Sequence, residues 1–280
     1  MAAIVGVSGG LAACSDAGPD PDGALEVLTS SYSTTYVAEA VVGDAGTVID
    51  LLPAGGEAHD LELSPRQVAR VQDAAFVFYL GDGFQPSVDQ AVTHRSRPSL
   101  DGMDAVPEEQ LREADPHVWL SPTIMAAMGD QLAEGLAQVD PEHADVFAEN
   151  AAKLRAELES VDAEFIEGLA NCQGAMLLTS HEAFGYLADQ YGLEQSGVMG
   201  INPEAEPSPK RLREIQELAA ETGASALFTE STDSSGQKLA DSLGLRSVPL
   251  HTLEIQPEGL DYPAAMRENL ASLQEGLVCN

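Results

Sequence analysis

The chain has 280 residues, of which 44% are hydrophobic and 21% are charged. This composition is typical of a packed globular protein and excludes a mainly disordered chain, and the length allows one large domain or two modest ones. Lys and Arg total 13 against 46 Asp and Glu, which gives a formal net charge of -33 without any basic stripe, so nucleic-acid binding is excluded.

The first feature along the chain is a short apolar segment, residues 4–13, that ends at Cys14. It is too short to span a membrane but has the length of a signal-peptide core. Residues 11–14 (LAAC) resemble the lipobox of bacterial lipoproteins, which implies cleavage before Cys14 and a lipid on its sulfur. Residues 15–23 then predict a flexible tether. Residues 1–8 carry no Lys or Arg, so we expect the natural start to lie upstream. The alternative is a buried strand with a chance cysteine.

Short apolar segments alternate with helical patterns through the rest of the chain. Strands are expected at residues 26–30, 47–52, 76–80, 175–179, 226–229 and 247–253. Helices are expected at residues 33–42, 65–71, 122–139, 184–191, 209–222 and 235–243. Two of these helices begin with Ser-Pro, at residues 64–65 and 208–209, which is a helix N-terminal signal. The alternation predicts parallel sheets covered by helices on both faces.

One long helix is predicted over residues 141–169, where apolar residues recur at steps of three and four from Phe147 to Leu169. Asp140 and Pro141 supply its N-cap and first turn. At 1.5 Å per residue this helix spans about 43 Å. The expected fold class is therefore α/β, with two parallel-sheet lobes joined by a rigid helix and a site in the cleft between them. The expected divisions are 1–24 (signal and tether), 25–139 (N-terminal lobe), 140–169 (connecting helix) and 170–280 (C-terminal lobe).

Side chains that can bind a metal follow several of the predicted strands. Ligands of open α/β sheets lie beyond the carboxyl ends of the strands. His59, His181, Glu230 and Glu254 lie at or after four such ends, and His117 precedes a helical segment. Imidazole and carboxylate groups together suit a borderline divalent cation such as Zn²⁺. Each residue taken alone also fits a solvated loop side chain, a helix cap or a surface acid. Three other histidines are expected to be structural or exposed, namely His94, His143 and His251.

The cysteines offer a second structural prediction. If Cys14 carries lipid, Cys172 and Cys279 remain as an even pair in an exported chain, which makes them a disulfide candidate. The bond would close a loop of about 108 residues and contribute about 4–5 kcal/mol in the chain-entropy model. Two unpaired thiols are the alternative.

Five stretches carry a resemblance to a known family. They are residues 52–60 (LPAGGEAHD), 78–84 (FYLGDGF), 115–120 (DPHVWL), 179–187 (TSHEAFGYL) and 228–230 (FTE). In this order they resemble the metal-binding receptor proteins of zinc and manganese ABC transporters, the ZnuA/TroA-like family, from about residue 25 to residue 279. The family usually has Pro where this chain has Ala58. Many zinc members have a His-rich loop where residues 93–113 contain only His94.

The resemblance implies a two-lobed receptor in which His59, His117 and His181 are metal ligands. The fourth family ligand is an acid of the C-terminal lobe. Glu254 stands where the family usually has Asp, so Glu230 or a water molecule is the alternative. We expect carboxylates to fix the tautomer of each ligating histidine. The candidates for that role are Glu182, Asp60 and Glu230.

The leading functional hypothesis is extracytoplasmic capture of Zn²⁺ and its delivery to an ABC-transporter permease. The resemblance implies a lipoprotein anchored through Cys14 to the outer face of the cell membrane, and we expect a monomer. His181 stands where manganese-type members have Glu, so Zn²⁺ is expected over Mn²⁺ or iron. We expect no enzyme activity. A zinc hydrolase with Glu182 or Glu230 as its base is the alternative, although the chain has no HExxH or GxSxG motif. A surface adhesin is a third hypothesis.

Overall fold

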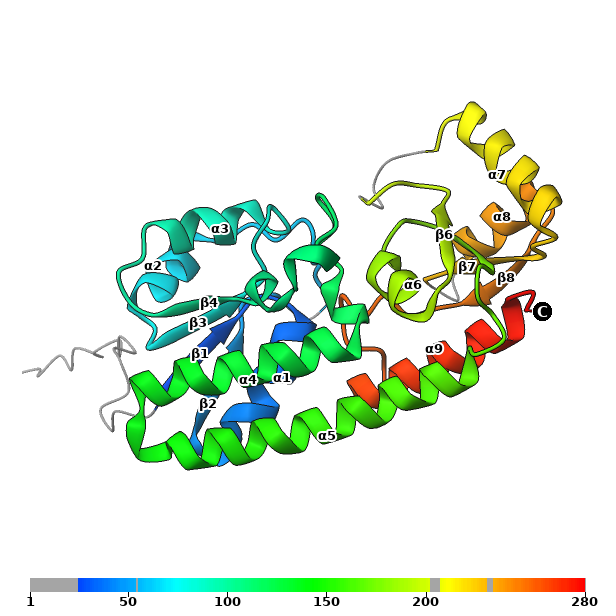
Figure 1. Cartoon of the computed structure of the whole chain (residues 1–280). Helices are drawn as coiled ribbons and strands as arrows, with labels where there is room; N and C mark the ends of the chain where they lie inside the picture. The colour runs from blue at the N-terminus through cyan, green and yellow to red at the C-terminus, as the bar shows by residue number, and fades with distance from the viewer. Residues whose placement is uncertain (1–24, 54, 202–206, 231–233, 280) are drawn as a thin grey trace, which may run out of the picture.

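The computed structural model describes residues 25–53, 55–201, 207–230 and 234–279, so the predicted lipobox at Cys14 and the tether lie outside the described residues. Two four-stranded parallel sheets form two lobes, and one long helix runs along both of them (Figure 1). The predicted α/β class with two lobes is confirmed. Within the described ranges, no helix is both long and apolar enough to cross a bilayer.

The first sheet has the strand order β2-β1-β3-β4 and is covered on both faces. Its strands are β1 (Leu25–Thr29), β2 (Gly46–Asp50), β3 (Phe76–Tyr79) and β4 (Ser99–Asp101), and its helices are α1 (Tyr32–Val42), α2 (Pro65–Asp73), α3 (Pro86–Thr93) and α4 (Pro122–Val139). Val27 packs into the core with α1 and α4, whereas Leu28 packs with α2 and α3. Successive strand residues point to opposite faces, so both must be apolar.

The second sheet repeats this arrangement in the order β6-β5-β7-β8. Its strands are β5 (Met176–Thr179), β6 (Glu194–Gly197), β7 (Ala226–Thr229) and β8 (Arg246–Pro249), and its helices are α6 (Gly185–Tyr191), α7 (Pro209–Thr222), α8 (Ser234–Leu243) and α9 (Tyr262–Gly276). Leu178 packs with α7 and α8, and the neighbouring Leu177 packs on the opposite face with α6 and α9. The predicted Ser-Pro starts are present, since Ser64 and Ser208 each accept a hydrogen bond from the backbone N–H three residues on.

The long helix α5 (Ala144–Gly168) has 25 residues and is about 38 Å long. Its buried stripe runs from Phe147 to Phe165, as the apolar spacing predicts. Helices α1 and α4 pack against its first half, and α9 lies along its second half (Figure 1). Arg267 of α9 and Glu164 of α5 add an exposed ion pair of 2.8 Å. The helix therefore belongs to the cores of both lobes.

The structure differs from the predicted elements in several places. The first three residues of the predicted long helix, Pro141–His143, form a separate 3-10 turn. Strand β8 ends at Pro249 rather than at residue 253, so His251 and Glu254 lie in the loop after it. Among the α-helices and strands of the described residues, four were not predicted, namely α3, β4, β6 and α9.

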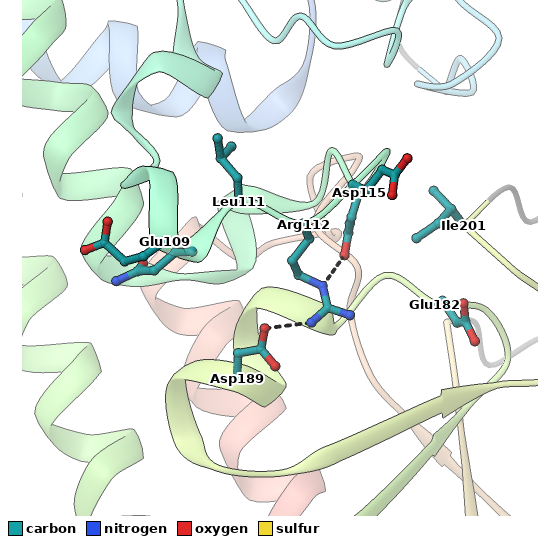
Figure 2. A pocket seen from close by; sticks show the side chains of 9 residues that line it. Glu109, Leu111, Arg112, Asp115, Glu182, Asp189 and Ile201 are labelled. Carbon is teal, nitrogen blue, oxygen red and sulfur yellow. Dashed lines mark hydrogen bonds and ion pairs between the residues drawn. The ribbon is translucent and has the colours of Figure 1, made fainter.

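The two lobes are joined by contacts other than α5. The buried Trp119 indole Nε1–H donates to the backbone oxygen of Thr252 at 2.7 Å, and the Tyr262 hydroxyl donates to the backbone oxygen of Trp119 at 2.6 Å. Arg112 of the first lobe contacts Asp189 on α6 of the second lobe (Figure 2). These contacts hold the carboxyl-end edges of the two sheets against each other.

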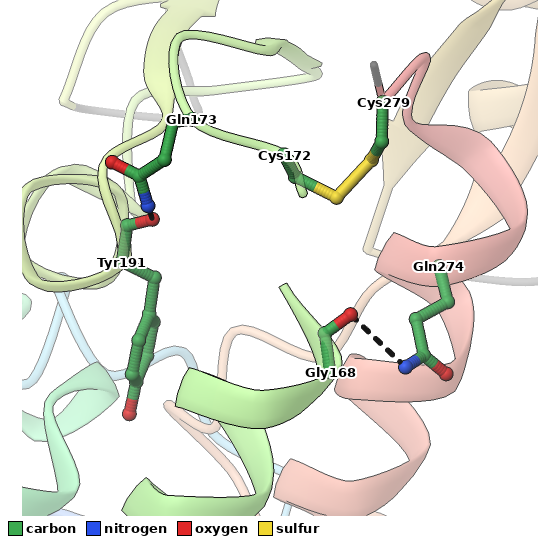
Figure 3. The surroundings of a disulfide bond; sticks show 6 residues. All are labelled: Gly168, Cys172, Gln173, Tyr191, Gln274 and Cys279. Atoms are coloured by element: carbon green, nitrogen blue, oxygen red, sulfur yellow. Dashed lines mark hydrogen bonds between the residues drawn. A yellow bond between two sulfur atoms is a disulfide. The ribbon is translucent and has the colours of Figure 1, made fainter. Parts of the chain in front are cut away.

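Cys172 and Cys279 form a disulfide bond across 107 positions of sequence. Cys172 follows the end of α5, and Cys279 follows the end of α9 (Figure 3). Beside the bond, the Gln274 side chain donates a hydrogen bond of 3.2 Å to the backbone oxygen of Gly168. The predicted disulfide pairing is therefore present, and it ties together the C-terminal ends of two parallel-running core helices.

Candidate metal centre

The predicted site residues lie on loops at the carboxyl ends of the strands. His59 is in the loop between β2 and α2, and His117 begins a 3-10 turn that leads into α4. His181 follows β5 after one residue, Glu230 directly follows β7, and Glu254 lies in the loop after β8. Parallel strands end at a common edge, so residues far apart in sequence reach one place.

One carboxylate oxygen lies close to all three imidazoles. Glu254 Oε1 is 3.7 Å from His59 Nε2 and 3.5 Å from the Nε2 atoms of both His117 and His181. Ligand atoms about 2.0–2.1 Å from a tetrahedral Zn²⁺ lie about 3.3–3.4 Å from one another. The three separations from Glu254 Oε1 are therefore close to the ligand–ligand distance of a tetrahedral zinc site. They are long for hydrogen bonds.

These four atoms are buried and lack hydrogen-bond partners within the protein. They are the Nε2 atoms of the three histidines and Oε1 of Glu254. The side chains of His117 and His181 are fully buried, and that of Glu254 is 8% exposed, while that of His59 is 14% exposed. Burying polar atoms without partners costs about 1–3 kcal/mol each. Among the described residues, ligand atoms within 4.8 Å of one another form two groups, His59 with His117 and Glu254, and His181 with Glu230 and Glu254, so Glu254 belongs to both.

Two carboxylates contact the far nitrogens of the buried imidazoles. Asp115 Oδ1 lies 2.8 Å from His117 Nδ1, and Glu230 Oε1 lies against His181 Nδ1. The hydrogen bond at His117 Nδ1 favours the tautomer that leaves Nε2 free to bind a cation, whereas the contact at His181 Nδ1 is an ion pair without hydrogen-bond geometry. Of the expected supporting acids, Glu230 has this contact, whereas Glu182 instead lies 3.5 Å from Arg211. Asp60, the third, is exposed.

Sequence reasoning missed the role of Asp115. Its position two residues before His117 is a usable signal, because a side chain at that spacing in a tight turn can reach the following backbone and ring. Asp115 Oδ1 indeed also accepts the backbone N–H of His117 at 3.1 Å. The carboxylate thus fixes both the main chain and the side chain of the histidine.

The carboxylates and imidazoles shift one another's pKa values. Burial opposes ionisation of Glu254, but contacts with His117, His181 and His59 outweigh burial and lower its pKa far below the usual value. Burial lowers the pKa of His181, but Glu230 and Glu254 outweigh this effect and raise the pKa to about 9. The pKa of His117 is raised in the same way, with burial opposed by Asp115 and Glu254. The carboxylates of the cluster therefore favour the positively charged form of His117 and His181.

Two backbone positions beside the cluster adopt the left-handed conformation without being glycine. Ala114, before Asp115, has φ 56°, and Leu253, before Glu254, has φ 58°. Non-glycine residues in this region cost about 1–3 kcal/mol and persist where the surroundings hold them. Near Leu253 that hold includes the hydrogen bond from Trp119 to Thr252. Backbone strain is thus located immediately before both carboxylates.

Comparisons with known proteins agree with this architecture. The family model described as "Zinc-uptake complex component A periplasmic" matches residues 27–276. The zinc-binding lipoprotein AdcA of Streptococcus pneumoniae is 30% identical over 95% of this chain. This chain spans only 58% of that relative's length. The high-affinity zinc uptake system protein ZnuA of Bacillus subtilis is 29% identical, with 91% of this chain and 88% of the relative covered.

A solved structure gives the same result in three dimensions. The Zn(II)-bound ZnuA-like domain of Streptococcus pneumoniae AdcA superposes with a TM-score of 0.78 at 29% identity. The superposition covers 91% of this chain and 99% of that domain.

Proposed function

The chain belongs to the periplasmic zinc-uptake component A family, and we propose that it captures Zn²⁺ outside the cytoplasm and delivers it to the permease of an ABC transporter. One observation carries this proposal. A single buried oxygen, Glu254 Oε1, lies 3.5–3.7 Å from three buried imidazole nitrogens, and none of these atoms has another partner. Such a donor set is characteristic of a four-coordinate zinc site.

In this proposal His59, His117, His181 and Glu254 are the four ligands of the transported ion. Glu230 acts through His181, because its oxygen lies against Nδ1 rather than Nε2. Three neutral imidazoles and one carboxylate leave a net charge of about +1 with Zn²⁺ bound. A sphere completed by Glu254 has no open position for a reactive water, which favours binding and release over hydrolysis.

The same donor set supports Zn²⁺ over Mn²⁺ or Fe²⁺ as the transported ion. Imidazole nitrogens suit zinc, whereas sites for manganese are richer in carboxylate and water oxygen. The direct experiment is metal analysis of protein refolded without metal and then offered equal Zn²⁺, Mn²⁺ and Fe²⁺. We expect about one Zn²⁺ per chain after desalting. Retention of Mn²⁺ or Fe²⁺ in its place, or of no metal at all, would contradict the proposal.

We also propose that the chain is held at the outer face of the cell membrane by a lipid on Cys14. The support is the LAAC sequence at residues 11–14 and the lipoprotein name of the streptococcal relative. The test is expression of the chain with its natural leader, and of Cys14→Ala, in a bacterial host supplied with labelled fatty acid. Label and membrane association should both be lost in the variant. Label retained by the variant would contradict the anchor.

A further inference from the structure

Arg112 lies where the two lobes meet and contacts a carboxylate from each of them. Its Nε atom is 3.1 Å from Asp115 Oδ2, and its Nη1 atom is 2.6 Å from Asp189 Oδ2 on α6. Figure 2 shows the guanidinium between these two side chains, in a polar pocket of about 460 Å³. The planar guanidinium can hold two carboxylates in fixed directions, which a lysine ammonium cannot.

The two oxygens of Asp115 have different partners. Oδ2 faces Arg112, while Oδ1 accepts from the backbone and ring of His117. Asp115 is only 2% exposed. A buried carboxylate needs a partner charge or several hydrogen bonds to stay ionised in a fixed position. A continuous series of polar contacts therefore runs from Asp189 through Arg112 and Asp115 to His117.

Helix α6 approaches Arg112 closely. A Cβ atom added at Gly185 would lie 2.4 Å from Arg112 Nε and 2.5 Å from Asp115 Oδ2, so the first residue of α6 must be glycine for the side chains to meet. The Tyr186 hydroxyl oxygen accepts the backbone N–H of Arg112 at 3.1 Å. Three residues of α6 therefore face Arg112: Gly185 leaves space for it, and the Tyr186 hydroxyl and the Asp189 carboxylate contact it.

We propose that Arg112 is a positioning residue that couples contact between the lobes to retention of the bound cation. It holds Asp115, and through Asp115 it holds His117, in the orientation needed for binding. When α6 moves away, Arg112 loses Asp189 and is held by Asp115 alone, so Asp115 and His117 are oriented less firmly. Release of the cation then accompanies separation of the lobes. This inference rests on the proposed function, since it assumes that His117 binds Zn²⁺.

The test is the rate at which zinc-loaded protein releases Zn²⁺ to excess chromophoric chelator, for the wild type, Arg112→Met and Asp189→Asn. We expect Arg112→Met to release Zn²⁺ about 10–100-fold faster, the range found when partners that orient metal ligands are removed. Asp189→Asn should show a smaller increase, because Arg112 still contacts Asp115. Arg112→Lys should release Zn²⁺ more slowly than Arg112→Met but faster than the wild type. Co²⁺-substituted Arg112→Met should show an altered visible spectrum, which a simple loss of stability would not produce.

Arg70→Met is the matched control. Arg70 forms an ion pair of 2.9 Å with Glu26 within the first lobe and is about as exposed as Arg112. It should release Zn²⁺ at the wild-type rate with an unchanged Co²⁺ spectrum.

The possible failures are distinguishable. Wild-type protein that holds no Zn²⁺ overturns the proposed function and this inference together. Wild-type protein that holds Zn²⁺, with Arg112→Met releasing it at the same rate, overturns this inference alone. If Arg112→Met does not fold, Asp189→Asn decides, because Asp189 is 63% exposed, and an unchanged release rate in that variant overturns the inference.

Discussion

Trp119 and Thr252 are joined by a buried hydrogen bond of 2.7 Å that crosses from one lobe to the other. Trp119 lies two positions after His117 in the first lobe, and Thr252 lies two positions before Glu254 in the second lobe. The indole N–H therefore sets the distance between the segments that carry two of the proposed ligands. The same contact supports the left-handed backbone at Leu253.

Replacing Trp119 by Phe should weaken both stability and zinc retention. The substitution leaves the Thr252 oxygen without its partner, which costs about 1–3 kcal/mol in the free energy of unfolding, besides the lost indole volume. Denaturant titration and zinc release measure the two effects. Phe147→Leu, in the first turn of α5 where the buried stripe begins, is the control: it should lower stability without changing the release rate. Equal release rates in Trp119→Phe and wild type would contradict the prediction.

Loss of a proposed ligand should cost more than loss of a supporting group. Because supporting groups contribute about 10–100-fold to metal affinity, His117→Ala should lower the zinc affinity by more than about 100-fold. Competitive titration against a chelator of known affinity measures this change. The exposed His94 offers the matched control, His94→Ala, which should bind as the wild type does. Unchanged affinity in His117→Ala would remove His117 from the site.

Zinc binding should release protons near neutral pH. The His181 pKa of about 9 means that this imidazole is mostly protonated at pH 7 without metal, and it must be neutral to bind. Glu254 releases none, because its pKa is lowered. The affinity for zinc should therefore fall about tenfold for each unit by which the pH is lowered, for each imidazole that must lose a proton. Calorimetry in buffers of different protonation enthalpy counts the released protons. A count of zero at pH 7 would contradict the raised pKa of His181.

The same shift predicts an opposite pH effect on the metal-free protein. A folded-state pKa raised from 6.5 to about 9 contributes stability that is fully present below pH 6.5 and is lost as the pH rises through 9. The free energy of unfolding of metal-free protein should therefore fall over that interval. Urea titrations at pH 6, 7.5 and 9 test the sign. Glu230→Gln removes one of the groups that raise this pKa and should flatten the dependence.

The disulfide should contribute stability without taking part in binding. Opening the loop between two cysteines 107 positions apart frees the unfolded chain and should lower the free energy of unfolding by about 4–5 kcal/mol in the chain-entropy model. Cys172→Ser/Cys279→Ser, compared with wild type under oxidising conditions, measures this difference. Its zinc affinity should stay unchanged, because the bond lies at the far ends of α5 and α9 (Figure 3). An unchanged unfolding midpoint would contradict the prediction.

The elements that could be predicted from sequence are those with a clear apolar period. Helix α5 is the clearest case, since its buried stripe is continuous from Phe147 to Phe165. Helix α9 was missed because a polar residue, Asn269, occupies the middle of its buried face, where it holds both backbone groups of His251. Asn269 stands where an apolar residue would be expected because it binds a loop 18 positions away, and the sequence around α9 does not reveal this contact.

The short edge strands were missed for a different reason. Strand β6 reads Glu-Gln-Ser-Gly and β4 reads Ser-Leu-Asp, so neither has the β-branched run typical of a buried strand. They are strands because β3 supplies the hydrogen-bonding edge for β4, and β5 supplies it for β6. Helix α3 has no ordinary cap, since the side chain of Gln85, at its N-cap position, instead donates to the backbone oxygens of Ser30 and Ala58.

The candidate site was predictable in part. The rule that ligands gather beyond strand ends placed His59, His181 and Glu230 correctly with respect to β2, β5 and β7. It could not distinguish Glu254 from Glu230, because that choice depends on which imidazole nitrogen each oxygen faces. The contact between Arg112 and Asp189 had no local signal, since the two residues lie 77 positions apart. The ligand roles and the chain divisions at residues 24, 139 and 169 stay predictions.

If the cluster residues bind Zn²⁺ as proposed, their unequal exposure gives the cation a direction of travel. Water reaches the ring of His59 more readily than that of His117 or His181, which are sealed. A hydrated ion arriving from outside would exchange its first water for His59, and a departing ion would part from His59 last. In the proposed function, the loading rate then depends on the partly exposed His59, while the residence time depends on the two buried histidines. Selection could therefore adjust how fast this receptor fills and how long it stays filled through separate residues.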